Sequence, residues 1–65
     1  YAVASFKGGG DVFGAAYAYM YGEWLPSSGW QPDDAPAIES YRGAPSGPMG
    51  KERFDFDLLI PVKPL

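Results

Sequence analysis

The C-terminal stretch, residues 53–65, constrains the fold more than any other part of the chain, because charged and apolar side chains alternate along its first half. Charged residues face one way and apolar residues the other: Arg53, Asp55 and Asp57 against Phe54, Phe56, Leu58, Ile60 and Val62. A period of two is typical of an antiparallel strand with one face in a core and the other in water. We therefore predict a strand over about 53–62, with Pro61 and Pro64 marking its end.

The two carboxylates on the polar face of this strand, Asp55 and Asp57, admit two interpretations. Paired carboxylates on either side of a scissile bond are the machinery of glycoside hydrolases. A sheet face in contact with water places two acidic residues in the same way without any chemistry. We favour the solvated face.

The chain begins with a second short apolar stretch, Tyr1–Phe6, and the glycines Gly8–Gly10 mark its end. This predicts a strand over about 1–7 followed by a turn. A phosphate-binding loop is the alternative for the glycines, but its spacing and its lysine are absent. Asp11 then stands where a helix can begin, and we expect its carboxylate to accept from the first free N–H groups.

Residues 11–25 have two competing periodicities. Tyr17, Tyr19 and Tyr21 alternate as in a strand, whereas a larger apolar set recurs at helical spacing: Phe13, Ala16, Tyr17, Met20 and Trp24. We predict a helix over about 11–25 that Pro26 closes, although Gly14 and Gly22 weaken it. Its inner stripe leaves Tyr19 and Glu23 on one flank and Tyr21 on the other.

A turn-rich connector, QPDDAP at residues 31–36, leads to a predicted strand over about 37–42. Asp33 and Asp34 could suggest a calcium loop, but the spacing of the remaining ligands is missing. In the strand, Glu39 and Tyr41 share one face with Ala37, and the pattern alone does not decide which face is the inner one. Residues 43–50 then form a hairpin loop. The order strand-helix-strand-strand predicts one α+β domain over residues 1–65.

Composition excludes several functional classes. The 65 residues contain no Cys or His, so disulfides and the usual zinc sites are excluded, and no metal or cofactor is expected. The net charge is −3 and the five basic residues are scattered along the sequence, unlike those of a nucleic-acid-binding surface. No stretch is long and apolar enough for a membrane span, so a cytoplasmic location is expected. So small a core favours association with a partner.

Several separate blocks of the sequence resemble one known family. The string AYMYGEWLPSSGWQPDDAPAIESY, followed after a loop by FDFDLLIPVKP, is similar to the carboxy-terminal half of the GyrI-like small-molecule-binding domain. That domain occurs behind the DNA-binding helices of AraC-type and MerR-type transcription regulators, as their effector-binding domain, and alone in gyrase-inhibitor-like proteins. The DNA-binding helices themselves are absent from this sequence, so no direct nucleic-acid binding is expected.

The resemblance implies a fold and a site. In the family, two strand-helix-strand-strand modules pack as a pseudo-twofold pair around a groove for hydrophobic, often cationic, small molecules. The glutamate of the P-x-x-E-x-Y strand, which is Glu39 here, supplies the counter-charge, and Tyr41 shares its face. The family's helix and closing-strand aromatics line the groove, which makes Tyr19, Tyr21, Trp24 and Phe56 the remaining candidates.

Only one of the two modules is present in this sequence. The resemblance therefore implies either a homodimer or a separate amino-terminal half module. We expect a small-molecule binder, such as an effector sensor or multidrug-binding protein. The alternatives are a hydrolase of reactive small molecules with the same pocket, and a protein-interaction module of the gyrase-inhibitor kind. The sequence does not separate binder from enzyme.

Overall fold

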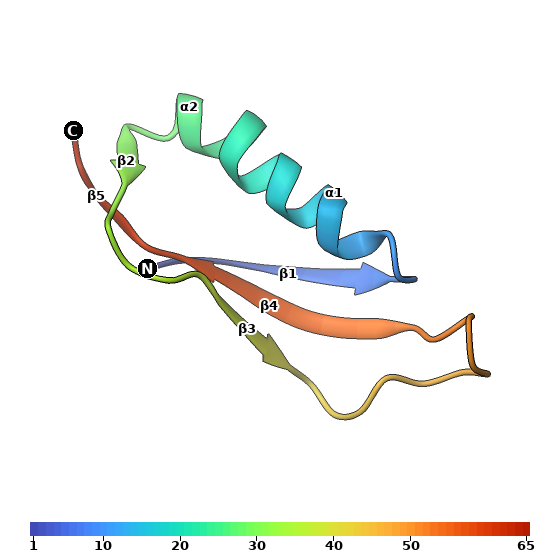
Figure 1. Ribbon diagram of the computed structural model, residues 1–65. Helices are drawn as coiled ribbons and strands as arrows, with labels where there is room; N and C mark the ends of the chain where they lie inside the picture. Colours follow the sequence, from blue (N-terminus) through green and yellow to red (C-terminus); the bar gives the residue numbers. More distant parts are fainter.

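The computed structural model describes residues 1–65 as one helix laid across a small antiparallel sheet (Figure 1). The helical stretch consists of α1 (Val12–Tyr19), η1 (Met20–Trp24) and α2 (Leu25–Ser27), which follow one another without a break. The strands are β1 (Ala2–Gly8), β2 (Trp30–Pro32), β3 (Ile38–Tyr41), β4 (Phe54–Ile60) and β5 (Val62–Pro64). This arrangement confirms the α+β class and agrees with half of the GyrI-like fold.

The main sheet has the order β1-β4-β3, so the alternating C-terminal strand lies in its centre. The register aligns Ala4 and Glu39 with Leu58, and it aligns Phe6 and Tyr41 with Phe56. Residues that stand opposite one another share a face of the sheet, and Leu58 and Phe56 face the helix. Glu39 and Tyr41 therefore lie on the inner face, a choice that the sequence pattern left open.

The core lies between the helix and the inner face of β4. Its fully buried side chains come from both layers: Ala16, Met20, Phe56, Leu58 and Ile60. Phe13 from α1 stacks on Phe56, with ring centroids 4.8 Å apart, and meets Phe54 edge to face. The predicted inward stripe of the helix is therefore present, and burial of these rings is the main force that holds helix and sheet together.

The middle of the helix widens into a π turn at Met20–Trp24, where the Leu25 N–H donates to the Met20 carbonyl five residues back. Pro26 was predicted to close the helix, but the helical geometry runs on to Ser27. A proline lacks the N–H and its ring collides with the carbonyl four residues earlier. A wider turn just before Pro26 moves that carbonyl aside, which explains why the helix continues. No part of this helix is long and apolar enough to cross a membrane.

The start of the helix differs from the prediction in one respect. Asp11 stands at the N-cap position, but its carboxylate makes no capping hydrogen bond. The backbone of Asp11 has helical angles, φ −77° and ψ −10°, whereas a capping side chain needs the extended conformation to reach the free N–H groups. The Gly9 carbonyl accepts from the Val12 N–H instead, at 2.9 Å, and closes the predicted turn.

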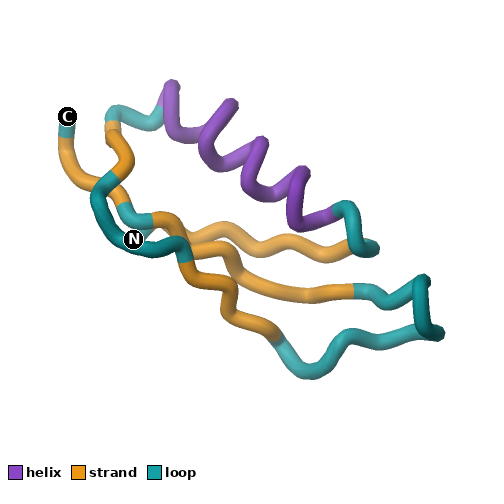
Figure 2. Tube along the Cα trace, viewed as in Figure 1, coloured by secondary structure: helices purple, strands orange, loops and turns teal.

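A second, two-stranded sheet forms beyond the helix, where β2 pairs with β5 (Figure 2). The connector at residues 31–36 was predicted to be a turn, yet its first two residues belong to β2, where Gln31 pairs with Lys63 and Pro32 pairs with Val62. Pro61 separates β4 from β5, so the C-terminal strand leaves the main sheet there and continues in this ribbon. Both strands are short and tolerate proline because each has a free edge.

The outer face of the sheet has no helix over it. Here Arg42 bridges both carboxylates of the central strand: its Nε donates to Asp55 at 2.9 Å and its Nη1 donates to Asp57 at 2.5 Å. Ser5 also donates to Asp57, at 2.6 Å. The carboxylates thus lie on a solvated face, as predicted, and a single guanidinium bridges them.

Candidate functional site

Glu39 lies at the centre of the candidate site, on the edge strand β3 and beneath the helix. Tyr17 of α1 donates its hydroxyl to Oε2 of Glu39 at 2.8 Å, and Tyr41 donates to Oε1. Both carboxylate oxygens therefore accept a phenol hydrogen bond, one from the helix and one from the same strand. Two such bonds fix the carboxylate in one orientation.

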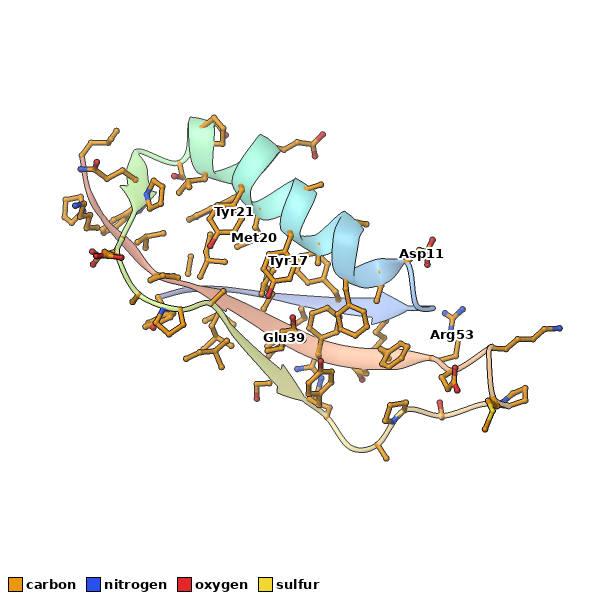
Figure 3. The ribbon with its side chains drawn as sticks, in the orientation of Figure 1. Asp11, Tyr17, Met20, Tyr21, Glu39 and Arg53 are labelled. Atoms are coloured by element: carbon orange, nitrogen blue, oxygen red, sulfur yellow. The ribbon has the colours of Figure 1, made fainter.

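Tyr21 completes an aromatic wall one helical turn beyond Tyr17. The two rings are parallel within 4° and their centroids are 6.4 Å apart. Figure 3 shows both rings on the same side of the helix, with Glu39 beneath Tyr17. The spacing of four residues brings these side chains together on one helix face. Tyr21 and Tyr41 are exposed, whereas Tyr17 and Glu39 are half-buried.

The electrostatics of the site come from Glu39 alone, because no Lys or Arg forms an ion pair with it. Burial and the hydrogen bond to Glu39 together raise the pKa of Tyr17 to about 12. The hydrogen bond to Glu39 also raises the pKa of Tyr41. Both phenols therefore remain protonated donors at neutral pH, and Glu39 is a half-buried carboxylate among neutral aromatic partners.

The other predicted site residues lie elsewhere. Tyr19 is on the opposite flank of the helix, where its ring meets Phe6 of β1 edge to face. Trp24 packs, partly buried, against the core. Phe56 is completely buried and presents no exposed surface, although its ring lies 5.8 Å from that of Tyr41 and supports it. Direct ligand contact by any of these side chains remains a prediction.

Tyr17 was not among the predicted site residues, yet it makes the central contact of the site. The sequence contained a signal for it, because Tyr17 precedes Tyr21 by four positions and a helix places such residues on one flank. It was assigned only to the inward stripe. Its ring does pack against the core, and its hydroxyl projects beyond the core to Glu39.

The Glu39 side of the molecule is an open surface rather than a closed pocket. The only hollow found in the structure lies at the other end of the sheet, between residues of β1, β4 and the loop after β3. Tyr17 contacts Glu39 from the helix and Tyr41 contacts it from the strand, whereas Tyr21 extends the aromatic surface beyond Tyr17. Because β3 is an edge strand and Tyr21 and Tyr41 are exposed, the site is open on the side away from β4.

Comparison with known proteins identifies the family. The sequence profile of the GyrI-like small molecule binding domain matches residues 1–63, nearly the whole chain. The chain therefore belongs to this family of small-molecule-binding domains. No curated protein and no solved structure gives a significant match.

Proposed function

We propose that the chain binds hydrophobic organic cations at the surface formed by Glu39, Tyr17, Tyr21 and Tyr41, as the sensor part of a regulator or as a drug-binding protein. The observation on which this rests is the environment of Glu39. It is half-buried and held by two phenols, and it has no basic partner. The other half-buried carboxylates of the main sheet, Asp55 and Asp57, are bound to Arg42.

The electrostatic argument favours a cation of low hydration. A carboxylate in partly apolar surroundings loses solvation, and its remaining charge is best compensated by a cation that also tolerates such surroundings. An organic ammonium or a delocalised dye cation meets this condition better than a small inorganic ion. Phenol donors stabilise the carboxylate without neutralising it, so its attraction for a cation is retained.

The aromatic residues supply the second part of the recognition. A cation over the face of a tyrosine ring gains about 0.5 to 2 kcal/mol for each well-placed contact. This attraction depends on charge and proximity rather than on a detailed shape. Exposed rings such as Tyr21 and Tyr41 therefore suit a site with broad selectivity.

The open side of the site, next to the edge strand β3, leads us to propose a partner that covers it. The molecule is elongated, with extents of 43 × 18 × 15 Å, and Tyr41 and Tyr21 are 48% and 38% exposed. A small-molecule site normally buries most of its ligand. A second copy of the chain, or an amino-terminal half module, would supply the missing wall.

The test is a titration of a fluorescent delocalised cation, rhodamine 6G, into the wild-type protein and Glu39→Gln. Loss of the charge is expected to weaken binding about tenfold or more, because hydrogen bonds and contacts to charged groups are worth more than neutral ones. Glu23→Gln is the matched control, since Glu23 is an exposed helix carboxylate and its substitution changes the net charge equally. Circular dichroism checks that each variant is folded.

Two results would contradict the proposal. Equal affinities of the wild type and Glu39→Gln for the dye would show that Glu39 does not take part in binding. Equal weakening in Glu39→Gln and Glu23→Gln would reduce the effect to the overall charge. Mass analysis of the dye after incubation separates binding from turnover, because a hydrolase would convert a susceptible ligand and a binder returns it unchanged.

A further inference from the structure

Folding gathers basic residues that are scattered in the sequence. Only five lysines and arginines occur in this acidic chain, and three of them, Lys7, Arg42 and Arg53, line one hollow at the loop end of the sheet. The hollow has a volume of about 300 Å³ and is the only one in the structure. The local charge is thus opposite in sign to the charge of the molecule.

The three basic side chains are not equally available. Arg42 forms ion pairs with Asp55 and Asp57, so its guanidinium is held in place at the side of the hollow. The Lys7 ammonium is 3.9 Å from Asp55, and its side chain is 75% exposed. Arg53 forms no ion pair and no side-chain hydrogen bond. One loosely paired ammonium and one unpaired guanidinium therefore face the hollow.

The loop after β3 gives the hollow a defined shape. The Ser46 N–H donates to the Arg53 carbonyl at 3.0 Å, and the Arg53 N–H donates back to Ser46. This pair brings the Ser46 side chain to the rim beside Arg53. Gly47 has φ +105°, and a Cβ there would lie 2.8 Å from the Lys51 carbonyl oxygen, so the turn depends on glycine.

We infer that this hollow, lined by Lys7, Arg53, Ser46 and Phe54, binds a small organic phosphate monoester. A guanidinium fork and an ammonium are the side chains that proteins use for phosphate, and the Ser46 hydroxyl is a further donor. Asp55 also borders the hollow, but it is paired with Arg42, and the lining keeps more positive than negative charges: Lys7, Arg42 and Arg53 against Asp55. The hollow is larger than a phosphate group alone, so it leaves room for an organic part beside the phosphate.

This site is separate from the Glu39 surface in position and in ligand charge. Lys7, Arg42 and Asp55 project from the outer face of the sheet, whereas Glu39 lies on the inner face with Leu58. The inference therefore does not rest on the proposed cation binding. Each site can be tested without the other.

The experiment is an NMR titration of the ¹⁵N-labelled protein with phenyl phosphate at pH 8 and constant ionic strength, where the monoester is a dianion. Saturable amide shifts are expected at Lys7, Ser46 and Arg53. Arg53→Gln and Lys7→Gln are each expected to weaken binding about fivefold or more. Lys63→Gln removes the same charge in β5, outside the hollow, and is expected to change the affinity by less than about twofold.

Several outcomes would overturn the inference. One is the absence of saturable shifts in the wild type, and another is equal weakening in all three variants, which would indicate only general charge attraction. A third is a set of shifts centred on Tyr17 and Tyr41. A titration with inorganic phosphate tests the organic part of the ligand: weaker binding than that of phenyl phosphate supports the organic monoester, and equal binding refutes it.

Discussion

Glu39, Tyr17 and Tyr41 form a coupled unit in which each side chain sets the state of the others. The carboxylate accepts from both phenols, and its charge makes the loss of a phenol proton more costly. Tyr17 therefore contributes to stability in its protonated form. Because its pKa is higher in the folded chain than in the unfolded chain, this contribution is complete below pH 10 and is lost as the pH rises towards about 12.

The first prediction in this region concerns Tyr17→Phe, which keeps the ring and removes the hydroxyl. We expect the free energy of unfolding at pH 7 to fall by about 1 kcal/mol, because a hydrogen bond to a charged group is lost. Between pH 10 and 12 the stability of the variant is expected to fall less steeply than that of the wild type. Urea denaturation across this range measures both effects.

Tyr19→Phe is the control for that comparison, since Tyr19 makes no hydrogen bond to Glu39. An absorbance titration of tyrosinate gives a second check. The wild type should show one phenol ionising near pH 12 that is missing from Tyr17→Phe. Identical titration curves for the wild type and Tyr17→Phe would contradict the assignment of this ionisation to Tyr17.

At the level of elements, glycine acts in two opposite ways. Gly14 is inside α1 with open space where a Cβ would stand, so it weakens the helix without any compensating contact. Gly47 occupies a turn with φ +105° and no room for a Cβ. The same substitution therefore has opposite consequences in the two elements.

Gly47→Ala is expected to lower the free energy of unfolding by about 1 to 3 kcal/mol, the usual range for a residue forced into such a conformation. Gly14→Ala is expected to raise it by about 0.5 to 1 kcal/mol, because alanine favours the helix. Urea denaturation of both variants and the wild type measures the sign of each change in the free energy of unfolding. A stabilising Gly47→Ala would show that the loop does not have the described turn.

Local sequence patterns predicted the central strand and the helix, because each of these elements buries one face. The alternation over Phe54–Val62 identified the central strand, and the helical spacing of Phe13 and Met20 identified the helix. The β2–β5 ribbon was missed because its two strands are far apart in sequence, only three residues long, and each contains a proline. The π turn was missed because it arises from the conflict between Pro26 and the preceding turn, which no periodicity encodes.

The candidate site was predicted in part for a related reason. The family resemblance located Glu39 and Tyr41, and the strand register then placed them on the inner face. Tyr19 and Tyr21 were equivalent in sequence, and only the position of the helix over the sheet separates them. Which flank faces β3 is a property of packing, and it could not be read from spacing.

The whole molecule is less compact than is usual for a domain of its length. Its radius of gyration is 13.0 Å, compared with about 11 Å for a compact domain of this length. Only 7 of 65 residues are buried, and large apolar side chains such as Val3 and Ile38 remain more than 40% exposed. These values indicate a structure that gains stability by covering part of its surface.

We therefore expect association in solution. Sedimentation equilibrium should give a mass above the 7.0 kDa of one chain at micromolar concentrations. If the partner is a second copy, the unfolding temperature should rise by a few degrees for a tenfold increase in protein concentration, because association stabilises the folded state by mass action. A monomeric mass, together with an unfolding temperature that does not change with concentration, would contradict this expectation.

The π turn at Met20–Trp24 also limits how the chain can vary in length. It places Met20 and Leu25, five residues apart, together on the buried side, where a regular helix repeats after three or four. Removal of one residue here would restore a regular helix and leave Met20 and Leu25 four residues apart, a spacing that keeps both on the buried face. The carbonyl four residues before Pro26 would then lie against the proline ring, and the last helical turn would be disrupted. The helix therefore tolerates substitutions at this turn better than deletions.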